Sequence, residues 1–94
     1  MTFTVEIEQT GRGGTITYTE DQGSLSFDWE FASSGADVFV APPAQWDANC
    51  TSRGAAWAVS RRQEILERVA DEVRRQKALG SVITIEDQWI HFEF

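Results

Sequence analysis

Apolar and polar residues alternate in three consecutive runs within the first 31 residues. This period of two is typical of strands with one buried and one solvated face. Turn-forming residues separate the runs, and pairing Ile7 with Ile16 and Tyr18 with Leu25 keeps every apolar residue on the same face of both hairpins. The chain therefore predicts a three-stranded β-meander. Its inward residues are Phe3, Val5, Ile7, Ile16, Tyr18, Leu25, Phe27, Trp29 and Phe31.

One long helix is predicted over residues 60–79. Ser60 and Gln63 fit the spacing of a capping box at the start, and Gly80 suits a left-handed residue just beyond the end. A start nearer to residues 53–58 is also compatible with the composition. The apolar residues fall on one stripe that can face a sheet. This stripe consists of Ile65, Leu66, Val69, Ala70 and Val73.

The last strands are predicted to form a C-terminal hairpin. Alternation pairs Ile85 with Ile90 and Ile83 with Phe92, and it places Trp89 and His91 on the opposite, outward face. Residues 38–40 are expected to add a short fourth strand of the meander. The fold class is therefore α+β, with residues 1–94 as a single domain. We expect two layers: a mostly antiparallel sheet of five to six strands, with the long helix packed on one face.

Residues 41–59 show no clear period and are predicted to be a long loop with at most one helical turn. Connections of this length are uncommon in small domains and are usually functional or disordered. Tryptophan is enriched at binding hot spots, so the loop tryptophans either line a binding surface or plug the open end of the core. With the outward residues of the last strand, the candidate binding surface is Trp46, Asp47, Cys50, Arg53, Trp57, Trp89 and His91.

Charge is sorted along the chain. Seven of the eight basic residues lie between Arg53 and Lys77, whereas eleven of the fifteen acidic residues lie outside this stretch, and the net charge is −7. Nucleic-acid binding is not expected, because acids are interleaved with the basic residues of the helix. Membrane insertion is not expected either, since no apolar run approaches the required length. The expected partner is a basic protein or a second copy of the chain, with Trp89 near the contact of a homodimer.

No pattern in the sequence indicates a catalytic or metal site. Cys50 and His91 are the only cysteine and histidine, and their spacing supports neither a nucleophile–base pair nor a zinc site. The glycine-rich residues 11–14 join two strands and lack the lysine of a phosphate loop. We therefore predict no catalytic residues, cofactor or metal.

The expected function is that of a small acidic, non-enzymatic interaction module that binds a protein partner, associates with itself or does both, as an immunity protein or a small regulator would. The single cysteine and the absence of an apolar leader favour a cytoplasmic location. The alternative is a small-molecule-binding protein or enzyme with a pocket between residues 41–59 and the long helix.

Overall fold

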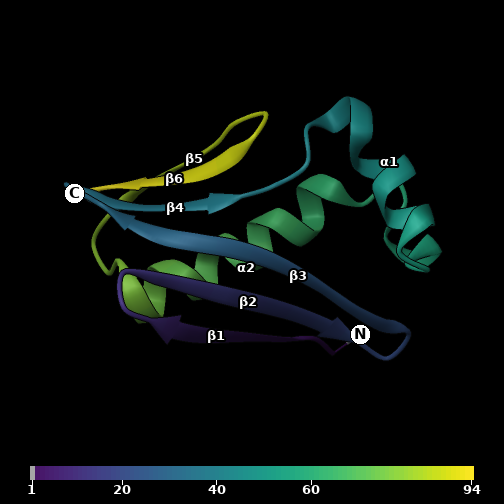
Figure 1. The fold of residues 1–94 in the computed structure, drawn as a ribbon, viewed down its shortest axis with the longest axis horizontal. Coiled ribbons are helices and arrows are strands. Elements are labelled where there is room, and N and C mark those ends of the chain that lie inside the picture. The colour runs from purple at the N-terminus through teal and green to yellow at the C-terminus, as the bar shows by residue number, and fades with distance from the viewer. Residues whose placement is uncertain (1) are drawn as a thin grey trace.

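The computed structural model describes residues 2–94 as a six-stranded open sheet with helices on one side (Figure 1). The strand order is β1-β2-β3-β4-β6-β5, and every neighbouring pair is antiparallel. The predicted α+β class is thus confirmed. The elements are β1 (Thr4–Thr10), β2 (Gly13–Glu20), β3 (Gly23–Ala32), β4 (Gly35–Phe39), α1 (Pro43–Ser52), the short 3-10 helix η1 (Ala56–Ala58), α2 (Arg62–Lys77), β5 (Val82–Ile85) and β6 (Trp89–Glu93).

The strand registers predicted from alternation are confirmed in all three hairpins that the sequence defined. Ile7 lies opposite Ile16, and Tyr18 lies opposite Leu25. In the last hairpin Ile85 lies opposite Ile90. β6 lies next to the edge strand β5 and pairs with β4 on its other side. The edges of the sheet are therefore β1 and β5.

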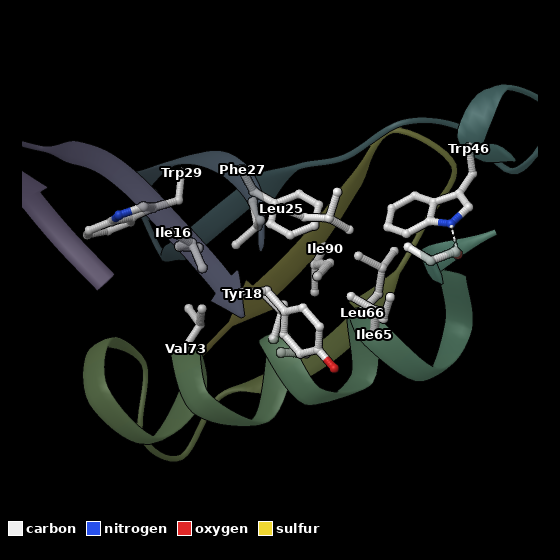
Figure 2. Close-up of a cluster of buried hydrophobic side chains, with 14 of the residues drawn as sticks. Ile16, Tyr18, Leu25, Phe27, Trp29, Trp46, Ile65, Leu66, Val73 and Ile90 are labelled. Carbon is white, nitrogen blue, oxygen red and sulfur yellow. Dashed lines mark hydrogen bonds between the residues drawn. The ribbon is translucent and has the colours of Figure 1, made fainter. Parts of the chain in front are cut away.

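The core lies between the inward face of the sheet and α2 (Figure 2). The predicted apolar stripe of α2 is buried throughout, with Leu66 and Val73 fully inaccessible to solvent. Burying a side chain of this size contributes roughly 1.5–3 kcal/mol. From the sheet, Figure 2 shows Ile16 and Tyr18 pointing toward the helix, while the Trp29 indole lies along the sheet and donates a hydrogen bond to the Glu8 carbonyl of β1 at 3.0 Å. Since one face of the sheet is covered in this way, the outward side chains of the strands remain exposed or half-buried.

The predicted capping box at Ser60 is wrong. Ser60 has φ of +63°, in the left-handed region, and α2 begins only at Arg62 without a side-chain cap. The Ser60 amide instead donates a hydrogen bond to Asp47 Oδ1 at 2.8 Å. The Gln63 side chain does not reach back either, because it donates to Glu67 on the next turn of the helix. Instead of a side-chain cap on α2, Ser60 thus provides a backbone hydrogen bond to α1.

The predicted loop at residues 41–59 is largely helical. α1 begins with Pro43 in its first turn, where a proline lacks no needed hydrogen bond, and ends before Gly54, whose φ is +73°. Only Trp46 and Cys50 of this helix are buried. Its position beyond the end of β4 (Figure 1) therefore depends on few apolar contacts.

Candidate binding face and pocket

The outward face of the sheet carries acidic side chains but no lysine or arginine. None of the six strands contains a lysine or arginine. Of their acidic residues, only Glu20 points inward, and the others define what we call the acidic face. A face lined by charges of one sign creates a potential that attracts a partner of the opposite sign. The acidic face consists of Glu6, Glu8, Asp28, Glu30, Asp37 and Glu93.

Two of these carboxylates lie directly opposite each other, Glu30 on β3 and Asp37 on β4. Like charges in this arrangement destabilise a sheet. On the far side of Asp37, His91 of β6 places its Nδ1 atom 2.6 Å from the Asp37 carboxylate. The hydrogen bond to Asp37 raises the pKa of His91 above its ordinary value of 6.5. Protonated His91 therefore compensates one end of this acidic row.

An exposed aromatic pair adjoins the acidic face. Phe39 on β4 lies opposite Trp89 on β6, and the two side chains are 42% and 40% exposed. The Trp89 indole donates a hydrogen bond to Glu86 at 2.6 Å, which orients the ring. Trp89 lies outward as strand parity predicts, whereas Phe39 was not among the predicted site residues. The same parity would have found it, because Phe39 follows the buried Val38 in a short strand.

A pocket of about 250 Å³ lies between β3 and α1. It exists because the β3–β4 ladder stops at Trp29 opposite Val38, while β3 continues to Gly23. The chain after β4 diverges toward α1 and leaves this part of the β3 edge open. From α1 and its C-cap residue, the pocket is lined by Trp46, Asn49, Cys50 and Arg53. The other lining residues are Leu25, Ser26, Phe27, Asp28, Phe39, Val40 and Ala41.

Trp46 both closes the core and forms part of the pocket. It is 3% exposed, its ring stacks on Phe27 at 6.3 Å between centroids, and its indole donates to the Ala58 carbonyl at 2.9 Å (Figure 2). Trp57 lies elsewhere. It is half-buried, stacks on Tyr18 and contacts Arg61. The two tryptophans of the predicted loop therefore do not form one exposed surface.

The remaining candidate residues are distributed over three places. Cys50 and Arg53 line the pocket, Asp47 binds the Ser60 amide, and His91 lies on the acidic face. Burial raises the pKa of the Cys50 thiol, which disfavours the reactive thiolate. The structure does not bring Cys50 and His91 together.

A buried ionic network joins the end of β2 to the start of α2, and sequence reasoning missed it. The Glu20 carboxylate accepts hydrogen bonds from Arg61 at 2.7 and 2.9 Å, from Arg68 at 3.3 Å and from the Tyr18 hydroxyl. Chiefly through Arg61, the network lowers the pKa of Glu20 below its ordinary value. Phe3 and Trp57 stack on Tyr18. The network holds α2 against the sheet.

Within residues 2–94 there is no group of three or more His, Cys, Asp or Glu side chains arranged to hold a metal ion. Among the same residues, no helix has the length and apolar character needed to cross a membrane.

Comparisons of the chain with protein-family models, with curated proteins and with solved structures find no match. The features that bear on function are therefore the acidic face, the aromatic pair and the pocket.

Proposed function

We propose that the protein is a small non-enzymatic interaction module whose acidic face binds a basic protein surface. The observation that carries this proposal is the sorting of charge between the two layers: the strands hold six outward carboxylates and no lysine or arginine. Two of the carboxylates, on Glu30 and Asp37, oppose each other at a cost in stability. A basic partner would relieve this repulsion on binding.

The aromatic pair supplies the apolar anchor for such an interface. Electrostatic attraction mainly accelerates association, whereas buried aromatic side chains mainly slow dissociation. From the sequence we expected Trp46 and Trp57 to anchor the partner. Because both contribute to the core, the proposal assigns this role to Trp89 and Phe39, which are exposed beside the acidic face.

Self-association is a second candidate, favoured by the composition of one sheet edge. The edge strand β5, Val82–Ile85, carries no charged residue, and Val82 is largely exposed. The opposite edge strand, β1, carries Glu6 and Glu8, so pairing two copies there would bring like charges together. A twofold dimer would therefore pair through β5. Sedimentation at high micromolar concentration should then show a dimer that Thr84→Lys weakens, because a charged side chain on an edge strand opposes its pairing with a second copy.

Affinity capture with three matched baits tests the basic-partner proposal. One bait is the natural chain. The face variant neutralises Glu8, Asp28 and Glu30 by conversion to Gln or Asn. The control variant neutralises three exposed acids outside the face, Asp21, Glu67 and Asp71, and therefore has the same net charge.

We expect basic proteins to be retained by the natural chain and the control variant and lost from the face variant. Retention should fall with added salt. Trp89→Ala should accelerate dissociation of the captured partner by on the order of 30-fold, as expected for a hot spot of about 2 kcal/mol. Capture of the same proteins by the face and control variants would refute the proposal.

A further inference from the structure

The pocket lies where α1 departs from the pattern of an amphipathic helix. Trp46, Asn49 and Cys50 of α1 occupy positions i, i+3 and i+4 on one stripe facing the sheet, and the C-cap residue Arg53 follows at i+7. In a helix that only packs, all four would be apolar. Here Trp46 and Cys50 are buried, but Asn49 and Arg53 are polar and exposed. These two polar residues line the space of about 250 Å³ between α1 and β3.

Groups of opposite charge line the pocket. Asn49 of α1 and the C-cap residue Arg53 contribute hydrogen-bond donors, and Asp28 contributes a carboxylate from β3. Neither the Arg53 nor the Asp28 side chain forms an ion pair or hydrogen bond with another residue in the part of the chain that the structure describes. Both charges are thus available to a ligand.

The open edge of β3 adds backbone groups to the same wall. Residues of an antiparallel strand direct their backbone N–H and C=O groups alternately to the two neighbouring strands. Phe31 donates toward the β1–β2 turn, at Arg12, so Ser26 directs its backbone groups to the opposite side, where the ladder with β4 has already ended. The apolar walls are provided by Phe27, Phe39 and Trp46.

We propose that this pocket binds a free α-amino acid with an apolar side chain. The carboxylate of the ligand pairs with Arg53 and Asn49, its ammonium group pairs with Asp28, and its side chain contacts the aromatic walls. The volume fits this size class, because pockets for drug-sized ligands are larger, at roughly 300–1,000 Å³. A molecule bearing a single charge would leave either Arg53 or Asp28 without a partner. The pocket shares Phe39 with the aromatic anchor and Asp28 with the acidic face, whereas Arg53 and Asn49 belong to neither.

The test is an NMR titration of the isotope-labelled protein with free leucine, methionine and phenylalanine, in parallel with their N-acetyl and carboxamide derivatives. We expect the free amino acids to shift the backbone signals of Ser26, Asn49 and Arg53. Each blocked derivative should bind at least about tenfold more weakly, since it lacks one charge-assisted interaction. Equal binding of the N-acetyl derivatives would overturn the proposal and indicate recognition of a peptide C-terminus instead.

Two variants test whether the amino acid binds in the pocket. Arg53→Gln should weaken binding of the free amino acid at least about tenfold, whereas Arg74→Gln, a matched loss of an arginine on α2, should leave it unchanged. Cys50→Leu, which fills the pocket with a larger apolar side chain, should also abolish binding, with the fold checked from the dispersion of the NMR spectrum.

Absence of any shift up to millimolar concentration, or shifts confined to other parts of the molecule, would overturn the assignment. Capture of a basic protein by the acidic face would be unaffected by Arg53→Gln, so a failure of one proposal is distinguishable from a failure of the other.

Discussion

Replacing Glu20 by glutamine should destabilise the protein by about 3 kcal/mol. The Glu20 side chain is 2% exposed and accepts hydrogen bonds from the two terminal nitrogens of the Arg61 guanidinium, at 2.7 and 2.9 Å. Breaking a buried pair by removing one partner costs roughly 3–5 kcal/mol. We expect the lower end of this range, because Arg61 and Arg68 are partly solvated and both retain Glu64 as a partner.

The effect should depend on pH in a direction that the structure fixes. The folded-state pKa of Glu20 is lowered, chiefly by the hydrogen bonds from Arg61, from an ordinary value of 4.5. Its contribution to stability is therefore fully present above pH 4.5 and is lost as the pH falls through the lowered folded-state pKa. The difference in unfolding free energy between the natural chain and Glu20→Gln should be constant near neutral pH and shrink in acid.

Urea unfolding followed by tryptophan fluorescence measures this difference, since Trp57 stacks on Tyr18 within the network. Glu6→Gln, which removes an exposed carboxylate from β1, is the matched control and should change stability by no more than about 0.5 kcal/mol. The reasoning would be wrong if Glu20→Gln unfolded at the same urea concentration as the natural chain. It would also be wrong if the difference between the two proteins remained undiminished at strongly acid pH.

Two further predictions concern single residues. His91 should titrate above 6.5 in an NMR pH titration, and Asp37→Asn should bring its pKa down, because the hydrogen bond to Asp37 is the main cause of the shift. His91 then stabilises the fold below pH 6.5, and this contribution is lost as the pH rises through its folded-state pKa; an unshifted His91 would contradict the contact. Ser60→Gly should stabilise the protein by up to about 1 kcal/mol in thermal unfolding, because it relieves a left-handed backbone at φ of +63°, whereas a loss of stability would argue for a capping role.

The strands and α2 were predictable because their signals are local. In β3, Leu25, Phe27 and Trp29 alternate with polar residues, and one register satisfies both of the hairpins that flank β2. The apolar stripe of α2 was equally predictable, since its apolar residues recur at helical spacing. The start of α2 was not predictable from the same logic. Serine is a favoured N-cap residue, but the backbone of Ser60 is held by the hydrogen bond to Asp47, thirteen residues earlier.

α1 could not be recognised from sequence because it has no side-chain cap, no acidic residue in its first turn and only two buried residues. It is held by tertiary contacts, such as the stacking of Trp46 on Phe27. Likewise, Glu20 lies beside a turn and resembles a solvated turn residue, while its partner Arg61 is 41 residues away. Among the candidate site residues, the alternation of β6 correctly placed Trp89 and His91 on the outward face. The pocket was not predictable in position, because it arises from the divergence of the chain after Phe39.

The position of β6 between β4 and β5 bears on how the chain folds during synthesis. The ribosome releases the meander β1–β4 and α2 before residues 89–93, yet both β4 and β5 complete their pairing only with β6. Until β6 emerges from the exit tunnel, β4 is paired only with β3, and its other edge has no partner. The strand that joins β5 to the meander is thus made after both of its neighbours, and until then the nascent chain exposes an open strand edge of the kind that promotes association.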